Sequence, residues 1–468
     1  MPANVSRSIA PAPPLEPALV QSLIDIVGAA HVLTDADERA PFETDWTGRF
    51  AGRTPAVVRP GTTAEVGAVV EACRVAAVAV VPQGGNTGLV GGGVPLAGEI
   101  VLSARRLDSI GPVDTTARQV TAGAGATLAA VQQAARAHGL RYAVDLAARD
   151  SATVGGSIAT NAGGLHVLRY GGTREQVLGV DAVLGNGAHV QRLQGLVKDN
   201  TGYHLPSLLC GSEGTLGIVT AARLRLVAEH AHKVVAILAF ERTTDAVRAV
   251  AALRSALDSL EAAELFLDPG LRLVCDAFDL RPPFERAWPV YVLVEVAAHE
   301  DPTDALAAAV AATSGVGDVA VADDATRRAA LWRLREDHTL AINTLGPPHK
   351  FDVTLPLDAL APFLDDIPGR ISAVAPTAQT WLFGHVGDGN VHVNVTGLDP
   401  HDERVADLVL GAVLELDGSI SAEHGIGTAK LAWMAAGRRA GDLAAMRAIK
   451  EALDPDGICN PNVLLPPQ

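Results

Sequence analysis

The sequence predicts an α+β chain, and its 468 residues are enough for two or more domains. The second half contains two apolar strand patterns, at 234–240 and 290–296, and a helical pattern follows each of them, from Thr244 and from Pro302. Repeated strand–helix pairs are typical of an antiparallel sheet that carries helices. The first half has the order strand, helix, strand over 56–82, followed by three glycine-rich tracts. We therefore expect one domain built around these tracts and a second, α+β domain with an antiparallel sheet.

Composition argues against several classes of protein. A formal net charge of −16 and the lack of a Lys- or Arg-rich run argue against a nucleic-acid-binding surface. No stretch reaches the ~18 consecutive apolar residues of a membrane span. The N-terminus lacks the apolar core of a signal peptide, so we expect a short disordered tail there. The cysteines are Cys73, Cys210, Cys275 and Cys459; they are far apart without CxxC spacing, which predicts reduced thiols and a cytoplasmic protein.

The first elements lead directly to a glycine-rich tract. We expect a short helix at 15–27, a buried strand at 56–60, a helix at 63–77 and a second strand at 78–82. The tract that follows, 83–92 (QGGNTGLVGG), has few bulky side chains, so its backbone amides can surround a phosphate-rich ligand without Lys or Arg. A flexible loop without a ligand is the alternative.

This first tract belongs to neither of the two common nucleotide-binding motifs. It is not a P-loop, because no Gly-Lys-Ser/Thr follows it. It is not a Rossmann turn either, because it continues into another strand, 99–103, where a dinucleotide fingerprint would begin a helix. We therefore expect a different way of holding a pyrophosphate.

Two more glycine-rich tracts follow in the first half. The second is 151–164 (SATVGGSIATNAGG), and a strand is predicted after it at 177–184. The third combines 198–203 (KDNTGY) with 209–219 (LCGSEGTLGIV), and a domain boundary is predicted near 228–233. Several such tracts in one domain indicate one long ligand.

A β-hairpin is predicted at 381–395 (WLFGHVGDGNVHVNV). Asp388–Gly389 is a preferred two-residue turn, and hydrophobic alternation flanks it on both sides. With that turn, His385 lies directly opposite His392, with Cβ atoms ~4.5–5.5 Å apart, and Asn394 lies further along the same face. Two imidazoles at this distance can hold one metal ion. An ordinary hairpin with two polar cross-strand histidines would have the same pattern.

A third ligand for such an ion is available in 419–427 (SISAEHGIG). Glu423 would complete a His, His, Glu set, which leaves coordination positions open, as catalytic metal sites do. His424 would then stand beside the metal as a free base. The alternatives are a capping carboxylate for Glu423 and a helix-entry histidine without a chemical role for His424.

Three potential hydrogen-bond donors precede the hairpin. Arg335 and Thr339 are four residues apart and would share one face of a helix, and Lys350 begins the next strand. Together they could bind a carboxylate, with the arginine as a bidentate donor. A solvated helix face with an unrelated lysine is the alternative.

The motifs PQGGNTGLVGGG, GGSIATNAGG, KDNTGY and GSEGTLGIVT resemble those of the flavin-linked D-2-hydroxy acid dehydrogenases, relatives of vanillyl-alcohol oxidase. The resemblance extends from about Phe42 to the C-terminus. It implies a two-part FAD-binding domain of the vanillyl-alcohol oxidase type at 1–228 and an α+β substrate (cap) domain at 229–415. A C-terminal segment, 416–468, would return to the FAD-binding domain.

The same resemblance implies which residues contact FAD. The first tract would surround the pyrophosphate, the second would line the ribityl chain and isoalloxazine, and the third would border the adenosine half. Residues 81–90 contain neither His nor Cys, so we expect noncovalent FAD. His166 is the nearby histidine that could provide a covalent link instead. The implied FAD-binding residues are Pro82, Gly84, Gly85, Asn86, Thr87, Gly88, Leu89, Ser151, Gly155, Gly156, Thr160, Asn161, Gly163, Gly164, Glu213, Gly217, Ile218 and Asn460.

In the second half, the resemblance implies a metal site and a base. His385, His392 and Glu423 match residues that hold a divalent metal, commonly zinc, and His424 matches the catalytic base. Such a metal would bind the C1 carboxylate and C2 hydroxyl of a D-2-hydroxy acid. The C2 hydride would then pass to flavin N5.

The resemblance also implies a substrate. Arg335, Thr339 and Lys350 match residues that bind the distal carboxylate in D-2-hydroxyglutarate dehydrogenases, and Asn394 matches a further substrate contact. We therefore expect oxidation of D-2-hydroxyglutarate to 2-oxoglutarate. Two alternatives stay open: a D-lactate or D-malate dehydrogenase with the same mechanism, and a non-catalytic flavin-binding sensor with structural zinc. Expected partners are an electron acceptor, such as an electron-transfer flavoprotein or a quinone, and a second copy of the chain in a homodimer.

Overall fold

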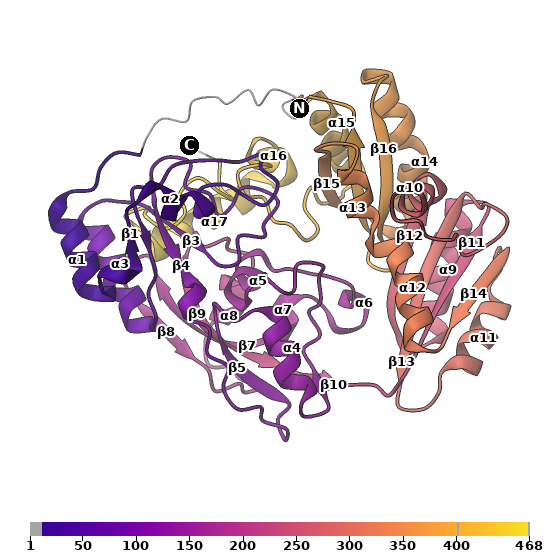
Figure 1. Cartoon of the computed structure of the whole chain (residues 1–468), viewed down its shortest axis with the longest axis horizontal. Helices are drawn as coiled ribbons and strands as arrows, with labels where there is room; N and C mark the ends of the chain where they lie inside the picture. The colour runs from indigo at the N-terminus through magenta and orange to yellow at the C-terminus, as the bar shows by residue number, and fades with distance from the viewer. Residues whose placement is uncertain (1–11, 400–401, 467–468) are drawn as a thin grey trace. The chain divides into compact units, whose positions relative to one another are not determined.

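The computed structural model describes residues 12–399 and 402–466, and the chain divides into two compact units (Figure 1). The first unit contains the described residues up to Ala162, Gly172–Ala228, and those from Glu423 onward; the second contains Gly163–Gly171 and Glu229–Ala422. The units divide after residues 228 and 422, and the expected domains, 1–228, 229–415 and 416–468, stay predictions. The functional labels of these segments stay predictions. The tail expected at the N-terminus lies mostly outside the described residues.

The first unit contains two four-stranded sheets, with strand orders β1-β2-β4-β3 and β5-β9-β7-β8, and a small β6-β10 pair. In the first sheet, β4 is parallel to both β2 and β3. The side chain of Thr62 caps the helix between β2 and β3, because it accepts a hydrogen bond from the backbone N–H of Glu65. The strands are β1 Val32–Leu33, β2 Val57–Val58, β3 Val80–Gln83, β4 Ile100–Ser103, β5 Gln119–Gly123, β6 Leu140–Arg141, β7 Val177–Leu184, β8 His189–Arg192, β9 Gly217–Arg225 and β10 Val227–Ala228. The helices are α1 Pro17–Val27, α2 Ala36–Arg39, α3 Thr63–Val75, α4 Leu128–Arg136, α5 Val154–Thr160, α7 Thr173–Gln176, α8 Leu205–Leu209, α16 Leu431–Gly437 and α17 Ala440–Leu453.

The second unit is built on one seven-stranded sheet with the order β14-β11-β13-β12-β16-β17-β15. All of the strand pairs that form this sheet among the described residues are antiparallel, which confirms the expected antiparallel sheet. The strands are β11 His232–Phe240, β12 Leu260–Leu267, β13 Val290–Ala298, β14 Asp318–Ala322, β15 His349–Thr354, β16 Gln379–His385 and β17 Asn390–Thr396. The helices are α6 Val167–Tyr170, α9 Thr243–Ala256, α10 Asp268–Phe278, α11 Thr303–Ala312, α12 Ala325–Glu336, α13 His338–Asn343, α14 Leu357–Val374 and α15 Arg404–Glu415.

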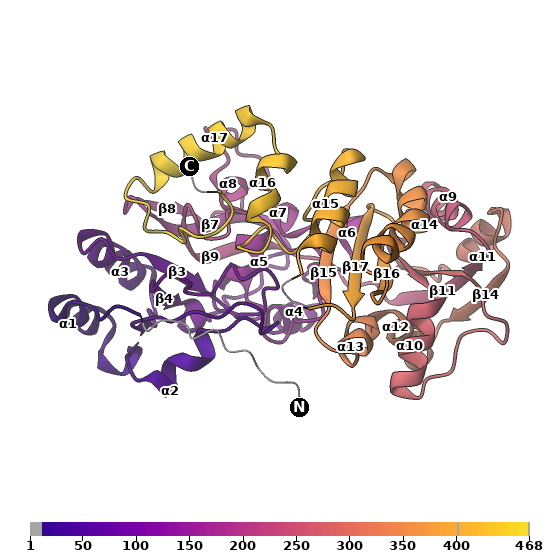
Figure 2. The ribbon, with the colours of Figure 1, turned by 90° about the horizontal axis from the view of Figure 1, so that it is seen from above.

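Helices lie on both faces of this sheet. Helices α14 and α15 lie on one side of β15, β17 and β16, and α10, α12 and α13 lie on the other side, as Figure 2 shows. A core packs the apolar side chains of Phe266, Tyr291 and Phe383 against Leu334 of α12 and Ile342 of α13. Four of the residues expected to form the metal and substrate site lie on this second face: Lys350, His385, His392 and Asn394.

The hairpin exists, but its register differs from the expected one. Phe383 pairs with His392, so the turn spans four residues, 386–389, and the pairing is shifted by two residues. Only Gly389 of the turn has a positive φ, of 86°, and the Asp388 N–H bonds to the His385 carbonyl. Because the shift is an even number, His385 and His392 still share a face, but as diagonal neighbours instead of direct partners.

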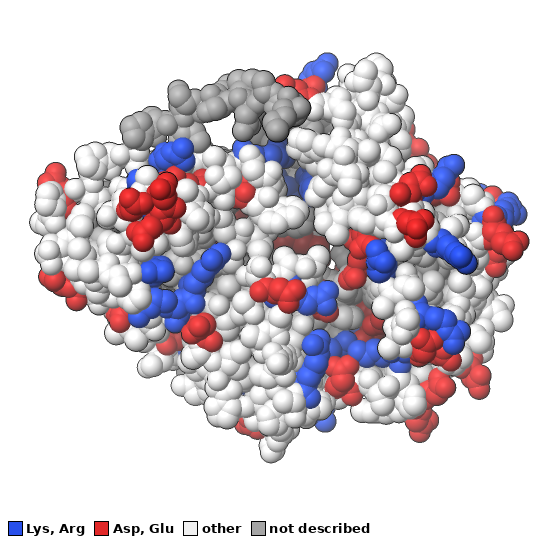
Figure 3. All heavy atoms as spheres, in the orientation of Figure 1, with Lys and Arg blue, Asp and Glu red and all other residues white. Residues whose placement is uncertain are grey.

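Three further observations concern the whole chain. Among the described residues, no helix is both long and apolar enough to cross a membrane. Acidic and basic side chains are interspersed on the face drawn in Figure 3, which agrees with the absence of a Lys- or Arg-rich run in the sequence. The four cysteines are free thiols, and three of them are buried.

The turn provides a first test of the fold. A Cβ at Gly389 would lie 2.3 Å from the Leu355 carbonyl oxygen, and φ is 86° there, so we expect Gly389→Ala to lower the free energy of unfolding by about 2 kcal/mol. Urea unfolding can be followed by fluorescence, because Trp288, Trp332 and Trp381 lie in this unit. The control is Gly369→Ala in α14, where a Cβ meets open space and helix propensity favours alanine. Equal unfolding midpoints for the two variants would contradict the assigned turn.

Candidate active site and its cofactor-binding residues

Strand pairing places the polar residues of the second unit on one face of the sheet. Residues that pair directly in an antiparallel sheet point to the same face, and so do residues two positions along each strand. Four of the residues expected from the sequence belong to this face, together with two carboxylates that were not expected. The rows of paired residues are Lys350, Asn394 and Trp381; then Asp352, His392 and Phe383; and then His385 with Glu264.

The two histidines of the hairpin are close enough to share an ion. Their ring centroids are 5.4 Å apart, and the ring planes are inclined at 80°. One ligand atom each of His385, His392 and Glu423 lies within 4.8 Å of the other two. The structure thus brings together the three residues that were expected to hold a metal, although their role as ligands stays a prediction.

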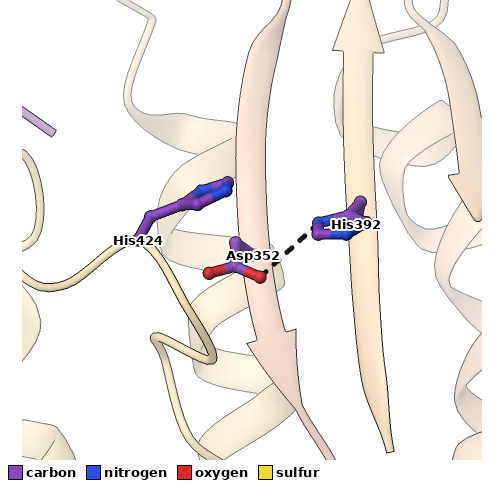
Figure 4. A group of neighbouring side chains, drawn as sticks. All are labelled: Asp352, His392 and His424. Atoms are coloured by element: carbon purple, nitrogen blue, oxygen red, sulfur yellow. Dashed lines mark ion pairs between the residues drawn. The ribbon is translucent and has the colours of Figure 1, made fainter. Parts of the chain in front are cut away.

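Glu423 and His424 reach the sheet through the segment that precedes them. The Ser419 N–H bonds to the Thr354 carbonyl at 2.8 Å, and the Ala422 N–H bonds to the Asp352 carbonyl at 3.2 Å. The segment therefore runs beside β15 up to the residue before Glu423. Figure 4 shows the ring of His424 pointing towards the strand that carries Asp352. One ligand atom each of Asp352, His392 and His424 lies within 4.8 Å of the other two.

The carboxylate of Glu264 links the metal-site candidates to the substrate-site candidates. One of its oxygens lies 2.6 Å from His385 Nδ1, and the other lies 2.7 Å from Arg335 Nη2. Burial alone would raise the pKa of Glu264, but the charges of His385 and Arg335 hold it below its ordinary value. Glu264 therefore accepts a hydrogen bond from the Nδ1–H of His385, so Nε2 is the nitrogen of that ring that would coordinate a metal.

A second carboxylate supports the other histidine. Asp352 Oδ1 lies 3.5 Å from His392 Nδ1 and accepts a hydrogen bond of 2.7 Å from Asn390 Nδ2. Carboxylates behind metal-ligating histidines orient the ring and raise its basicity. Sequence analysis missed both of these acids. The available signal was an acidic residue between two apolar neighbours, in the segments LEAAELFL for Glu264 and HKFDVT for Asp352.

These residues fit a divalent metal. Two imidazoles and one carboxylate form a donor set that zinc and similar ions accept, and it leaves positions open for a substrate. Each imidazole has a carboxylate partner at its Nδ1, so Nε2 is the nitrogen that would coordinate an ion. His385, His392 and Glu423 would hold the ion.

Arg335 is buried instead of lying on a solvated helix face. In addition to its ion pair with Glu264, its guanidinium lies 4.6 Å from the centre of the Phe383 ring. His338 supports Arg335, because its Nδ1 lies 3.0 Å from the Arg335 carbonyl oxygen. Burial lowers the pKa of His338 to about 3, so the ring is neutral. A neutral His338 donates from Nδ1 to that carbonyl. This histidine was also missed by sequence analysis.

The other two residues of the expected carboxylate clamp lie on separate elements. The single helix expected through Arg335 and Thr339 is interrupted at Asp337, and Thr339 belongs to α13. Lys350 lies on β15 and is partly buried, and this burial lowers its pKa to about 8. That these residues bind one carboxylate together stays a prediction.

In the first unit, the first two glycine-rich tracts pack directly on each other. A Cβ at Gly84 would lie 2.2 Å from Thr153 Oγ1, and one at Gly85 would lie 2.0 Å from the Ser151 carbonyl oxygen. Only glycine permits this approach of two backbones. A Cβ at Gly88, in contrast, would meet open space, so part of the first tract is left uncovered by the protein. The packed tracts make a surface of backbone amides that fits a phosphate-bearing cofactor.

The third tract is joined to the C-terminal segment by two polar side chains. The Glu213 carboxylate accepts hydrogen bonds of 2.7 Å from the backbone N–H groups of Ile426 and Gly427. The Asn460 amide donates to the carbonyls of Gly92 and Glu213. The carboxylate of Glu213 is thus engaged within the protein, so a contact of this residue with FAD would come from its backbone.

The remaining residues expected to bind FAD are distributed over these tracts. Asn86 and Asn161 have the left-handed backbone conformation, with φ of 57° and 51°. Gly163 and Gly164 group with the second unit. Pro82 is in β3, followed by the loop that contains Thr87 and Leu89; Gly155, Gly156 and Thr160 are in α5; and Gly217 and Ile218 are in β9. The contacts of these residues with the cofactor stay predictions.

Comparison with known protein families identifies both parts of the chain. The family described as FAD linked oxidases, C-terminal domain, matches residues 229–464, and the family described as FAD binding domain matches residues 54–192. The chain is 40% identical over 459 residues to a protein named D-2-hydroxyglutarate dehydrogenase from Xanthomonas citri pv. viticola, covering 95% of this chain and 96% of that protein. The chain belongs to the FAD-linked oxidases. It is an FAD-dependent dehydrogenase, which contradicts the alternative of a non-catalytic sensor.

Other relatives and solved structures agree with this assignment. The mitochondrial D-2-hydroxyglutarate dehydrogenase of Bos taurus is 36% identical over 458 residues, covering 95% of this chain and 82% of that protein. An alkyldihydroxyacetonephosphate synthase structure aligns with a TM-score of 0.76 at 16% identity, over 98% of this chain and 87% of that one. A p-cresol methylhydroxylase structure aligns with a TM-score of 0.75 at 16% identity, over 95% of this chain and 96% of that one. These structures confirm the vanillyl-alcohol oxidase-type fold of this FAD-linked oxidase.

The role of Glu264 beside His385 can be tested by measuring metal affinity instead of activity. We expect Glu264→Gln to weaken metal binding by about 10–100-fold, because His385 would lose the carboxylate that orients it and raises its basicity. Metal affinity is measured by titration of the metal-depleted flavoprotein. Glu241→Gln is the control, because Glu241 is an exposed partner of Arg286. An unchanged metal affinity in Glu264→Gln would contradict the supporting role of this carboxylate.

Proposed function

We propose that the chain oxidises D-2-hydroxyglutarate to 2-oxoglutarate, assisted by a divalent metal, which we expect to be Zn²⁺. The observation that carries the proposal is the single sheet face that holds the histidine pair together with Lys350 and the Glu264–Arg335 pair. The names of the relatives, at 33–40% identity, support the same substrate.

The chain's own residues would bind the substrate at both ends. His385, His392 and Glu423 would hold the ion, and Lys350 and Arg335 would attract the distal carboxylate. Among the described residues, Arg335 Nε is buried and has no hydrogen-bond partner, so this donor is available for a substrate oxygen. Thr339 and Asn394 would complete the contacts with the substrate.

Two groups would share the oxidation. Bound FAD supplies the two-electron oxidant that takes the C2 hydride at N5, and a bound divalent metal supplies a Lewis acid for the C2 hydroxyl. His424 would take the hydroxyl proton, as a general base within reach of the site. One proton and one hydride leave the hydroxy acid, which balances the conversion of its C2 alcohol to a ketone.

D-lactate or D-malate as substrate is the competing proposal. It is favoured by one observation: Arg335 is already paired with Glu264, so its charge is partly balanced before any substrate binds. In that case Arg335 would have a structural role. A short substrate such as lactate would also need no distal clamp.

Other expectations stay proposals. FAD would be noncovalent, because residues 81–90 contain neither His nor Cys. The reduced flavin would pass its electrons to an electron-transfer flavoprotein or a quinone. We propose a homodimer, and a cytoplasmic location in agreement with the free cysteines.

Lys350 distinguishes the two substrates. We expect Lys350→Met to raise KM for D-2-hydroxyglutarate about 10–100-fold, since a charge-assisted hydrogen bond is lost, and to change KM for D-lactate far less. Anaerobic dye reduction measures both substrates. In the native protein, the ratio of kcat/KM for D-2-hydroxyglutarate to that for D-lactate should fall as the pH rises above about 8, because the ammonium group of Lys350 loses its proton there. If Lys350→Met raised KM for D-2-hydroxyglutarate and for D-lactate by the same factor, the proposal that Lys350 binds the distal carboxylate would be contradicted.

Metal removal tests the other end of the site. We expect a chelator to abolish turnover while the protein keeps its FAD, because the metal and flavin sites use different residues. Absorbance of the flavin after gel filtration measures retention, and added Zn²⁺ should restore activity. Full activity after complete removal of metal would contradict metal assistance.

A further inference from the structure

A second group of candidate metal ligands lies within the second unit, on strands β12 and β13. It consists of His166, which directly precedes α6, with Glu261 on β12 and Glu295 on β13. All three side chains are at least nine-tenths buried. None of them belongs to the FAD, metal or substrate sets of the proposed function.

A β-bulge brings the two carboxylates together. The pairing of β12 with β13 shifts between Leu260 and Ala262, so Glu261 is the extra residue. A bulge of this kind redirects a side chain, and bulges are frequent at functional sites. Ala262 pairs with Glu295, which places the bulge beside that second acid.

In each of the two carboxylates, one oxygen accepts a hydrogen bond from a neighbouring side chain and the other oxygen lies near the imidazole of His166. Glu261 Oε1 accepts from the Tyr170 hydroxyl at 2.6 Å and from Arg169 Nη1 at 3.0 Å. Glu295 Oε2 accepts from Trp332 Nε1 at 2.8 Å. The other oxygens, Glu261 Oε2 and Glu295 Oε1, lie 3.9 and 3.5 Å from His166 Nε2.

The separations around His166 Nε2 are longer than a direct charged hydrogen bond and match the spacing of ligands around an ion. A charged imidazole that donates to a carboxylate is expected at about 2.7–2.9 Å, and His385 approaches Glu264 to 2.6 Å in this same unit. Ligands at about 2.0–2.2 Å around a tetrahedral ion are instead separated by about 3.3–3.6 Å. The separations of 3.5 and 3.9 Å around His166 Nε2 are closer to the second pattern.

Burial and charge point the same way. His166 Nδ1 is buried and has no hydrogen-bond partner among the described residues, so only its Nε2 side faces polar groups. Two buried carboxylates need compensating charge. Arg169 pairs with Glu261 and the charge of Lys233 acts on Glu295, and a divalent ion between the two carboxylates would add to this compensation.

We propose that His166, Glu261 and Glu295 bind a divalent first-row metal ion such as Zn²⁺. Imidazole and carboxylate ligands both suit such an ion. Because the ligands are buried and already oriented by Tyr170 and Trp332, the site is structural and fastens residues 163–171 to strands β12 and β13.

The test counts metal ions per FAD in the full-length flavoprotein after equilibration with Zn²⁺ and desalting. We expect two ions in the native protein, one in His166→Ala and one in His392→Ala, and none in the double variant. His138→Ala is the control and should keep two, because His138 is exposed on the other unit. Loss of an ion in His166→Ala but not in His392→Ala would support this site while contradicting the one in the proposed function. An equal number of ions in the native protein and in His166→Ala would overturn the proposal.

A second measurement covers the case in which His166→Ala does not fold. Crystals of the native holoenzyme soaked in Zn²⁺ should give an anomalous peak at the zinc edge about 2.0–2.2 Å from His166 Nε2. A peak at His385 and His392 without one at His166 would overturn the proposal. In that case His166 would be a charged partner of the two glutamates and nothing more.

Discussion

The candidate active site depends on the buried carboxylate of Glu264. This one group bonds to His385 and to Arg335, which belong to the proposed metal and substrate sets. A lone buried carboxylate would be strongly unfavourable, whereas its two partners hold it ionised. Removing one partner of such a pair typically costs about 3–5 kcal/mol. The two halves of the site are therefore coupled through a residue that is itself inaccessible to substrate.

The antiparallel sheet explains why these groups can meet. Its alternation sends Val391, Val393 and Val395 to one face, where all three are buried, and sends His392 and Asn394 to the other. The second face has an apolar part and a polar part, which follow each other along the order of the strands. Helices α10, α12 and α13 pack on it around Phe266 and Tyr291, and the row of polar residues continues from there onto β16, β17 and β15. A polar site is thus built on the same rigid sheet that carries the apolar core.

The first unit achieves its binding surface by a different principle. The surface is formed by glycine-rich backbone and not by charged side chains, because Gly84 and Gly85 contact the second glycine-rich tract directly. Side chains such as Glu213 and Asn460 then hold the tracts and the C-terminal segment in position. This arrangement agrees with a chain of net charge −16 that binds a phosphate-bearing cofactor without a cluster of Lys and Arg.

The sequence by itself determined the local features. Periodicity predicted the strands and helices, glycine content marked the cofactor tracts, and alternation in the hairpin put His385 and His392 on one face even though the turn was wrong by two residues. The turn itself depends on a contact with Leu355, which no pattern within the hairpin contains. Only the tertiary structure decided the pairs that join distant segments: His385 with Glu264 across 121 positions, Arg335 with that same acid, and His166 with two glutamates. Propensity and periodicity act over a few neighbouring residues, whereas these contacts arise from the order and register of strands in the folded sheet.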